Sequence, residues 1–468
     1  MLGAMRIQFL GATRTTTGSM YLWEVNGKRL LLECGLFQGH REETTRRNCN
    51  FPFDPKRIDA VVLSHAHIDH AGNLPNLVKQ GYGGPIHCTT ATQDLCGIML
   101  IDSAHIQEQD ALFVSKWRAK KHLPPVEPLY RIADAEQAVK QLVGHDYETA
   151  FCPVDNVNIT FRDGGHILGS AQVILDVQEN GERFRWLFSG DVGRGADELL
   201  RDPIPVENVD YLQIESTYGN REHAVRTDAD ATVGRLVGET LAQRGKVIIP
   251  AFSVGRTQQI VYVLHGLTCA GKLPRVPIFV DSPLSTKASD VYERHRESLR
   301  PDLSAAMCDS SSPFDMGNLI YISEAGESKQ LNDRHEPMII ISASGMAEAG
   351  RIRHHLANNI EDKKNLILFI GYCAEGTLGS QITAGKTPVN IFGEPHPVRA
   401  QVVSMDTYSG HADKHELKRY VEQMSGSFKK IFCIHGEEDS CRAHAETLHA
   451  MKPKAQVLVP EYQQVVEI

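Results

Sequence analysis

The segment SHAHIDH, residues 64–70, places three histidines and one aspartate within six consecutive positions. Four titratable side chains in such a row are costly to bury unless something binds them. A metal ion is the obvious candidate, because imidazole and carboxylate groups are its usual protein ligands. The segment therefore predicts a metal site.

The spacing within this segment favours two metal ions. His65 and His67 follow the apolar run DAVVLS and, being two residues apart, lie on one side of an extended segment. Asp69 and His70 follow at the turn into the next helix and face a second position. Two divalent ions about 3.5–4 Å apart can lower the pKa of a shared water and stabilise both reacting oxygens of a phosphodiester. The nucleophile would then be hydroxide.

Three further candidate ligands follow other apolar runs. His166 lies in GGHILGS, Asp191 in SGDVG and His435 in IFCIHGEE. Strand ends that meet at one edge of a sheet can bring such side chains together. Ligands without thiolate favour a catalytic site with an open coordination position, and the two oxygens of Asp191 can bridge two cations. Cys433, two residues before His435, is expected to pack inside its strand.

The N-terminal half of the chain reads as strands and hairpins. Short apolar runs alternate with turn residues from Arg6 to about Pro205. Helical periodicity interrupts them at about 90–121 and again at about 133–142.

The pattern then changes to apolar strands followed by helices, which predicts a parallel sheet. It returns to the first pattern after about His396, with a helix at about 413–424. We therefore expect one domain, residues 1–220 and 396–468, interrupted by a second domain at 221–395.

Composition narrows the class of protein. The 468 residues, 41% hydrophobic and 23% charged, are typical of a globular chain of about two to four domains. No membrane-spanning run or secretory signal is recognisable, and Met1–Ala4 reads as an alternative start. Ten scattered cysteines without a CxxC pair favour reduced thiols in the cytoplasm.

The net charge of −9 argues against a general basic surface for nucleic acid, so phosphate binding must be local. The stretch SKWRAKKH carries Lys116, Arg118, Lys120 and Lys121. Such a cluster is more often a solvated helix face.

These motifs carry a family resemblance over nearly the whole chain. HAHIDH, GGHILGS and SGDVG resemble the metal motifs of the metallo-β-lactamase superfamily, and ESTYG, YSGHAD and IHGEED resemble the three extra motifs of its β-CASP branch. That branch contains RNA-processing nucleases, including relatives of the nuclease subunit of the cleavage and polyadenylation factor and, more distantly, the ribonuclease J type. The resemblance implies an α/β fold: an αββα metallo-β-lactamase sandwich with an inserted parallel-sheet β-CASP domain.

The resemblance also implies roles for individual residues. It implies two zinc ions per chain, held by two ligand sets that share Asp191: His65, His67, His166 and Asp191 for one, and Asp69, His70, Asp191 and His435 for the other. Asp69 counts among the catalytic residues, together with Glu215 and His411 as an acid pair. Glu33 stands where the family usually has an aspartate beside the metal ligands, so its longer side chain puts the local geometry in question.

His411 is the candidate general acid. Phosphodiester cleavage leaves an alkoxide, and a carboxylate partner such as Glu215 would favour the protonated imidazole that can neutralise it. The alternative is that His411 only begins a helix, with Ser409 or Asp413 as its cap.

Candidate phosphate contacts lie in the predicted inserted domain. SASGMAEAG places Ser342, Ser344 and Gly345 between an apolar strand and a helix, where hydroxyls and amides suit a phosphate. The stretch also resembles the family loop that receives the RNA backbone. A purely structural turn is the commoner outcome. FSVGR, with Arg256, and DSPLS are weaker candidates.

The predicted function is a two-zinc ribonuclease that cleaves single-stranded RNA in a cleft between the two domains. The alternatives are a DNA nuclease of the same branch, a small-molecule hydrolase such as a thioesterase or lactonase, and a non-catalytic RNA-binding subunit. Every ligand position is filled, which disfavours the last, and the large insert disfavours the small-molecule class. Endonuclease or 5′-to-3′ exonuclease action, and a monomer or homodimer, stay open alternatives.

Overall fold

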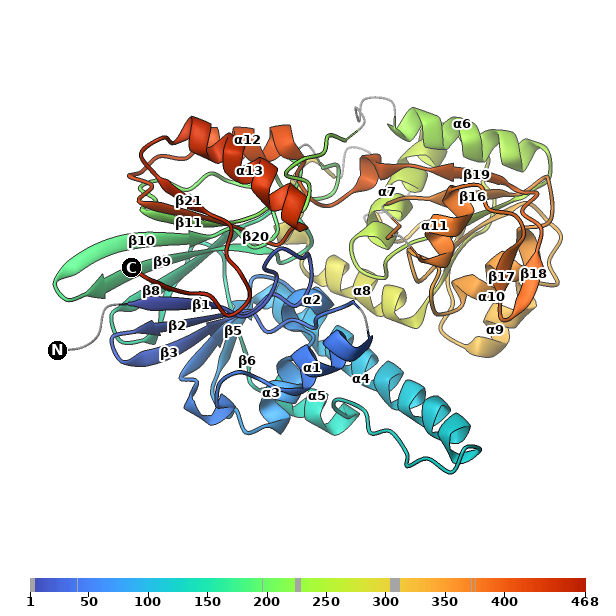
Figure 1. Ribbon diagram of the computed structural model, residues 1–468. Coiled ribbons are helices and arrows are strands. Elements are labelled where there is room, and N and C mark those ends of the chain that lie inside the picture. The colour runs from blue at the N-terminus through green and yellow to red at the C-terminus, as the bar shows by residue number, and fades with distance from the viewer. Residues whose placement is uncertain are drawn as a thin grey trace. The chain divides into compact units, whose positions relative to one another are not determined.

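The computed structural model describes residues 5–39, 41–195, 197–223, 229–303, 312–371, 373–374 and 376–468. The chain divides into two compact units (Figure 1). The first comprises Met1–Asp197, Arg201–Glu222 and His411–Ile468, and the second comprises Glu198–Leu200 and His223–Gly410. No helix among the described residues is long and apolar enough to cross a membrane.

The first unit contains two seven-stranded sheets. One has the order β22 (Val465–Glu467), β1 (Arg6–Phe9), β2 (Tyr21–Val25), β3 (Lys28–Leu32), β4 (Ala60–Val62), β5 (Ile86–Thr89) and β6 (Leu142–His145). The other has the order β21 (Gln456–Leu458), β20 (Lys430–Ile434), β11 (Tyr211–Glu215), β10 (Glu182–Phe188), β9 (Ala171–Glu179), β8 (Val157–Asp163) and β7 (Ala150–Val154).

The core of this unit lies between the inner faces of the two sheets. Along β8 the buried positions alternate with partly exposed ones, because successive side chains of a strand point to opposite faces. The rings of Trp23 from one sheet and Trp186 from the other meet edge to face, 4.6 Å between centroids. Trp186 also stacks on Phe432, 5.3 Å away.

Helices cover the outer faces of both sheets (Figure 1). The first sheet carries α1 (Arg41–Cys49), α2 (Ile68–Ala71), α3 (Leu74–Lys79), α4 (Thr90–Ala119) and α5 (Ile132–Lys140). The second carries α12 (Lys414–Glu422) and α13 (Glu438–Met451), whose apolar side chains pack on its outer face in a separate buried cluster. The four layers confirm the predicted αββα sandwich.

The second unit is built on a six-stranded parallel sheet. Its order is β14 (Leu319–Tyr321), β13 (Ile278–Asp281), β15 (Met338–Ser342), β12 (Lys246–Pro250), β16 (Leu366–Phe369) and β19 (Gln401–Ser404). Its helices are α6 (Ala229–Ala242), α7 (Arg256–Cys269), α8 (Pro283–Arg294), α9 (Ala325–Gln330), α10 (Ile352–Asn359) and α11 (Leu378–Thr383). A short hairpin joins β17 (Val389–Ile391) to β18 (Glu394–His396). The predicted inserted parallel sheet is confirmed.

Three details differ from the sequence expectations. β19 pairs with β16, so the second unit continues to Gly410, whereas we placed its end at 395 and read 401–404 as part of the first domain. α10 begins at Ile352, so Ser344 and Gly345 lie in a loop and not at a helix start. Cys269 is disulfide-bonded, although we expected reduced thiols. Neither the spacing of motifs nor the pattern of apolar residues in the sequence indicates the pairing of β19 with β16, the start of α10 or the disulfide at Cys269.

Candidate metal centre

The candidate ligands of the first unit lie at one edge of its two sheets. β3 and β4 run parallel, and so do β10, β11 and β20, so the carboxyl ends of neighbouring strands meet. His65 follows β4, Asp191 follows β10 and His435 follows β20. His166 lies in the loop between β8 and β9. Strand direction thus collects residues that are up to 370 positions apart in sequence (435 − 65).

Four donor atoms form a first set. His67 Nδ1 lies 3.2 Å from His65 Nε2 and 3.1 Å from His166 Nε2. Asp191 Oδ2 lies 3.4 Å from both His65 Nε2 and His166 Nε2. A cation at the usual zinc–nitrogen length of about 2.0–2.1 Å separates tetrahedral donors by about 3.3 Å, so the set has the dimensions of a zinc site.

A second set lies beside the first. His70 Nε2 is 3.1 Å from His435 Nε2, and Asp69 Oδ2 is 3.4 Å from His435 Nε2 and 3.8 Å from His70 Nε2. Asp191 Oδ1 lies 3.3 Å from His70 Nε2. The two oxygens of Asp191 therefore face different sets.

The protonation chemistry of the first set suits metal binding. Burial lowers the pKa of His65 and of His166, and it lowers the pKa of His67 to about 3. A neutral imidazole has one nitrogen whose lone pair can bind a metal ion, and the tautomer decides which nitrogen that is. His67 Nδ1 lies 3.2 Å from His65 Nε2 and 3.1 Å from His166 Nε2, the separation expected between ligands of one cation. Asp191 Oδ1 is buried and accepts no hydrogen bond from the residues that the structure describes, which makes it a candidate metal ligand.

Glu33 orients two of these histidines. It accepts a hydrogen bond from His70 Nδ1 at 2.5 Å, which turns His70 Nε2 towards the second set. It also accepts from the backbone N–H of Ser64 at 2.6 Å and from the Ser64 hydroxyl at 2.9 Å. That hydroxyl lies 3.0 Å from His65 Nδ1. The longer side chain of glutamate thus reaches the ligands and supports both rings.

Two residues of the centre have left-handed backbone conformations, as have other non-glycine residues elsewhere in the chain. Glu33 has φ +63° and His435 has φ +49°, both in the left-handed region. This conformation costs a residue other than glycine about 1–2 kcal/mol. Strain of this kind gathers at functional sites, where surrounding contacts hold it.

Glu215 connects His411 to this centre. It is fully buried at the end of β11 and lies 3.1 Å from His411 Nδ1 through Oε2. Burial alone would lower the pKa of His411, but the carboxylates of Glu215 and Asp191 outweigh it and raise the pKa to about 9. Asp413, not His411 or Ser409, caps α12 by accepting from the backbone N–H groups of His415 and Glu416. One cap named in the helix-start alternative, Asp413, is thus confirmed, but α12 begins at Lys414, so His411 lies outside the helix.

Two supporting residues escaped the sequence analysis. The Thr217 hydroxyl donates to Glu215 Oε2 at 2.6 Å and lies 3.1 Å from His435 Nδ1, so it links the acid pair to a candidate ligand. The backbone N–H of Val192 donates to Glu215 Oε1 at 2.5 Å. Thr217 lies inside the ESTYG motif, so that motif could have indicated its role. Nothing in the sequence indicates the role of the Val192 N–H.

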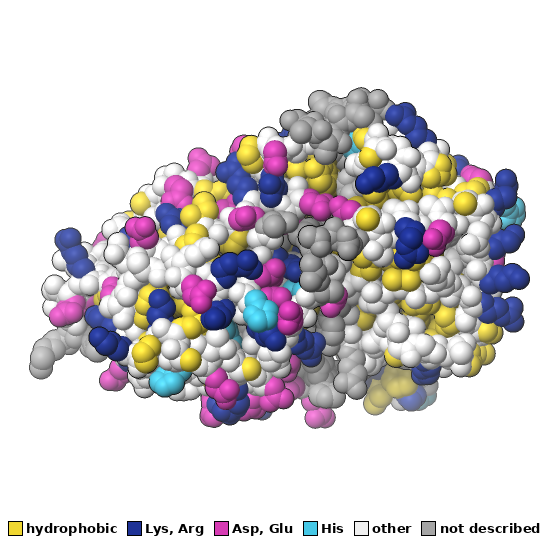
Figure 2. Space-filling model, turned by 90° about the horizontal axis from the view of Figure 1, so that it is seen from above, with side chains coloured by type: hydrophobic (Ala, Val, Ile, Leu, Met, Phe, Trp, Pro, Cys, Tyr) yellow, Lys and Arg dark blue, Asp and Glu magenta, His cyan; other side chains and the backbone are white. Residues whose placement is uncertain are grey.

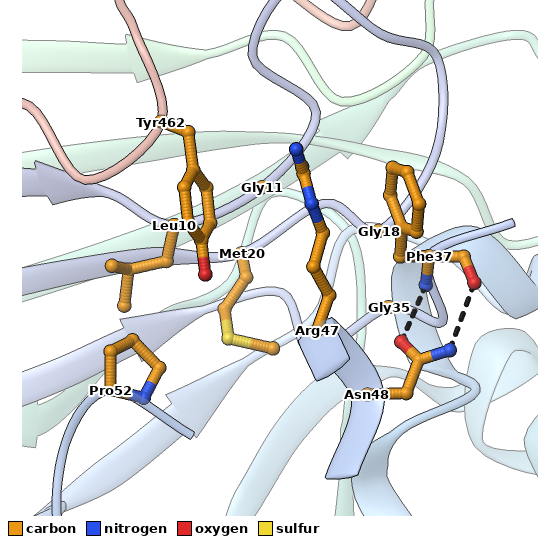
Figure 3. A pocket seen from close by; sticks show the side chains of 10 residues that line it. All are labelled: Leu10, Gly11, Gly18, Met20, Gly35, Phe37, Arg47, Asn48, Pro52 and Tyr462. Carbon is orange, nitrogen blue, oxygen red and sulfur yellow. Dashed lines mark hydrogen bonds between the residues drawn. The ribbon is translucent and has the colours of Figure 1, made fainter. Parts of the chain in front are cut away.

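A small pocket is lined in part by Gly35 and Phe37, which follow Glu33 in the sequence (Figure 3). The guanidinium of Arg47 lies between the rings of Phe37 and Tyr462, 4.3 and 4.5 Å from their centroids. The Asn48 side chain makes two hydrogen bonds to the backbone of Phe37, 2.8 and 2.9 Å long. Any side chain at Gly35 would collide with the Asp69 carbonyl, so the pocket wall and the second set pack directly together.

The predicted phosphate contacts belong to the second unit. Ser342 is buried and its hydroxyl donates to the Asp281 carbonyl at 2.9 Å, so that hydroxyl is already engaged. Ser344 is partly exposed and its hydroxyl accepts from the Glu348 N–H at 3.2 Å. A side chain at Gly345 would collide with the Phe252 ring. Arg256 is the first residue of α7.

Family models match three parts of the chain. The metallo-β-lactamase superfamily model matches residues 13–233, the β-CASP domain model matches 257–382, and the model of the Zn-dependent metallo-hydrolase RNA specificity domain matches 395–460. Their order agrees with a lactamase-type domain that is interrupted by an insert.

Whole-length relatives agree with these models. Ribonuclease TTHA0252 of Thermus thermophilus is 35% identical over 444 residues, 95% of this chain and 96% of that protein. An RNase J-like protein of Methanocaldococcus jannaschii is 31% identical, covering 94% of this chain and 95% of that protein. Transcription termination factor FttA of the same organism is 29% identical over 97% of this chain and 70% of its own length.

Comparison with solved structures supports the fold. A crystal structure of a protein of unknown function from Enterococcus faecalis V583 aligns over the full length of both chains, with a TM-score of 0.56 and 12% identity. At that identity the match concerns the fold alone. The family models and the whole-length relatives lead to one conclusion: the chain belongs to the β-CASP branch of the metallo-β-lactamase superfamily, a family of zinc-dependent metallo-hydrolases.

Proposed function

We propose that this chain is a ribonuclease that uses two zinc ions to hydrolyse phosphodiester bonds of single-stranded RNA. The observation that carries the proposal is the position of Asp191, whose Oδ2 faces one set of donors at 3.4 Å and whose Oδ1 faces the other at 3.3 Å. One zinc would bind to His65, His67, His166 and Asp191. The other would bind to Asp69, His70, His435 and Asp191.

The residues divide the work between them. Zinc ions bound there would supply a water of lowered pKa and positive charge for the phosphate oxygens. The seven side chains would hold the ions, and Glu33 fixes the tautomer of His70 by accepting from its Nδ1 at 2.5 Å. No serine or cysteine nucleophile is needed. Cys433, the cysteine beside His435, is buried within β20.

His411 is the proposed general acid. Its Nδ1 is held by the carboxylate of Glu215 at 3.1 Å, so Nε2 carries the proton that can pass to the leaving oxygen. The side chain of His411 keeps 22% of its surface exposed, whereas the Glu215 side chain is fully buried. The pair therefore has one member fixed in the core and one that a substrate can reach.

Several observations support RNA as the substrate. The compared proteins include a ribonuclease and a transcription termination factor, and a model of an RNA specificity domain matches residues 395–460. On the face of the molecule seen in Figure 2, acidic and basic side chains are interspersed, and the described residues form no broad basic patch there for a duplex. Ser344, Gly345 and Arg256 remain our proposed contacts to RNA phosphates. Ser342 is withdrawn, because its hydroxyl is engaged with the Asp281 carbonyl.

The test is a comparison of substrates of equal length. Single-stranded RNA, duplex RNA, single-stranded DNA and duplex DNA, with 5′-phosphate or 5′-hydroxyl ends, are incubated with the zinc-loaded protein, and a thioester is assayed in parallel. We expect single-stranded RNA to be cleaved fastest, with no thioester hydrolysis. Faster cleavage of DNA would favour the DNA nuclease alternative. Efficient thioester hydrolysis without nuclease activity would favour the small-molecule hydrolase.

A further inference from the structure

The C-terminal half of α4 exposes large apolar side chains. The first half of this helix is buried through residues such as Leu95, Cys96 and Leu100. Further along, Phe113 keeps 75% of its surface exposed and Trp117 keeps 51%. Figure 1 shows this part of α4 extending beyond the strands of the first sheet. Grouped exposed apolar side chains mark an interaction site more often than single ones do.

The exposed rings share their face of the helix with positive charges. Phe113, Lys116, Trp117 and Lys120 are spaced by three or four residues, which places them together on an α-helix. The ammonium group of Lys121 lies 3.8 Å from the centroid of the Trp117 ring. Stacking surface and positive charge therefore occur at the same place.

This charge is local and, among the residues that the structure describes, no acidic side chain forms an ion pair with Lys116, Lys120 or Lys121. The whole chain carries a net charge of −9, whereas residues 116–121 hold four basic side chains and no acidic one. Arg118 has a structural part in this stretch, since its Nε donates to the Pro124 carbonyl at 2.6 Å and fastens the loop that follows. Lys116, Lys120 and Lys121 are exposed, so they can contact an anionic partner.

Exposed aromatic rings interleaved with lysines fit single-stranded RNA, because bases stack on the rings while phosphates meet the ammonium groups. We propose that Phe113, Lys116, Trp117, Lys120 and Lys121, here called the α4 platform, bind single-stranded RNA outside the metal centre. This inference rests on the proposed ribonuclease function and adds a second contact region for the same substrate.

α4 connects the platform to the metal centre. At its start, the hydroxyls of Thr89 and Thr92 donate to the Gly169 carbonyl at 2.7 and 2.8 Å, three residues after His166. Phe113 lies 23 residues beyond Thr90, about 35 Å along the helix at 1.5 Å per residue. Only an RNA that spans this distance can occupy both places, so the platform should act on long substrates and not on short ones.

The experiment compares three variants on two RNAs. The double variant Phe113→Ala/Trp117→Ala removes the rings, and Lys116→Gln/Lys120→Gln/Lys121→Gln removes the charges. Phe392→Ala is the matched control, because Phe392 is an aromatic residue 50% exposed beneath a cation, Arg353, at 4.5 Å. Single-stranded RNAs of about 5 and about 30 nucleotides are compared, since site sizes in such proteins run from about 4 to 16 nucleotides.

For the long RNA we expect the ring variant to bind about tenfold or more weakly by fluorescence anisotropy and to show a matching rise in KM. Its kcat, its metal content and its action on the short RNA should equal those of the parent. Log affinity falls as log salt rises, and the lysine variant should reduce the magnitude of this negative slope by about 2, near 0.7 for each lost phosphate contact. Phe392→Ala should change neither quantity.

Three results would overturn the inference. If both variants bind and cleave the long RNA with the affinity and KM of the parent, the α4 platform does not bind RNA. The proposed function would still hold. A ring variant that changes oligomeric mass while its RNA affinity per chain is unchanged would make the patch an interface between copies. Absence of RNA binding and cleavage by the parent protein would reject the proposed function together with the platform.

Discussion

Each unit has a buried carboxylate at the carboxyl edge of its sheet, and the two carboxylates have different surroundings. Asp281, which ends β13 of the second unit, accepts from Arg351 Nη1 at 2.7 Å through Oδ1 and from the Ser328 hydroxyl at 2.6 Å through Oδ2, which also lies 2.6 Å from His355 Nε2. Asp191, in the first unit, has a buried Oδ1 with no hydrogen-bond partner among the described residues, and histidine nitrogens lie around it. A buried aspartate at a strand end is thus a structural element where its oxygens are satisfied and a candidate ligand where they are not.

The largest expected effect separates these two aspartates. Asp191→Ala removes the oxygens that face both donor sets, so we expect both metals to be lost and activity to fall to background. Asp281→Ala removes the buried carboxylate that pairs with Arg351 and His355, which should lower the free energy of unfolding by about 3–5 kcal/mol. It should leave the metal content of the folded protein unchanged. Elemental analysis and chemical denaturation measure the two effects, and metal loss in the folded Asp281 variant would erase the distinction.

The second effect concerns the acid pair. His411→Ala should lower kcat by about 10²–10⁴-fold, because general acid catalysis has this magnitude, while both metals stay bound. His415→Ala is the control, since that histidine lies four residues away with 59% of its side chain exposed. Steady-state kinetics with elemental analysis decide the case. Joint loss of metal and activity would make His411 a ligand or a structural residue.

A smaller effect is expected for Glu33, which supports ligands without facing both donor sets. Glu33→Gln keeps the size of the side chain and removes the charge that accepts from His70, so metal affinity should fall by about 10–100-fold. The control is Glu179→Gln, because Glu179 is a buried carboxylate that, among the described residues, accepts only from the backbone N–H groups of Met5 and Asn26, both at 2.8 Å. Competition with a chromophoric chelator measures affinity. Equal affinities in the two variants would remove Glu33 from the account.

The smallest effect is expected in the second unit. Ser344→Leu should raise the KM for RNA by about fivefold, the worth of one hydrogen bond of about 1 kcal/mol, and leave metal content unchanged. Ser342→Ala should leave KM unchanged, because its hydroxyl is buried against the Asp281 carbonyl. The opposite ranking of the two serines in steady-state kinetics would restore Ser342 and displace Ser344.

The sequence predicted where strands end. It did not predict which polar side chains are hydrogen-bonded to each other in the folded protein. Apolar runs followed by His65, Asp191 and His435 located the edge where these side chains meet, because strand periodicity and chain direction are local properties. The engagement of Ser342 with Asp281, 61 residues away, depends on tertiary pairing and has no local signal. The same holds for Thr217, whose hydroxyl joins Glu215 to His435, and for the pairing of β19 with β16.

The central claim is that Asp191 joins two distinct metal sites, and metal stoichiometry tests it most directly. Zinc per chain is measured by elemental analysis in the parent protein, in His67→Ala and in His435→Ala, each purified under identical conditions. The account predicts two zinc ions in the parent and about one in each variant, because His67 lies with His65 and His166 in the first donor set and His435 lies with Asp69 and His70 in the second. One zinc ion in the parent protein, or loss of all metal in both variants, would contradict it.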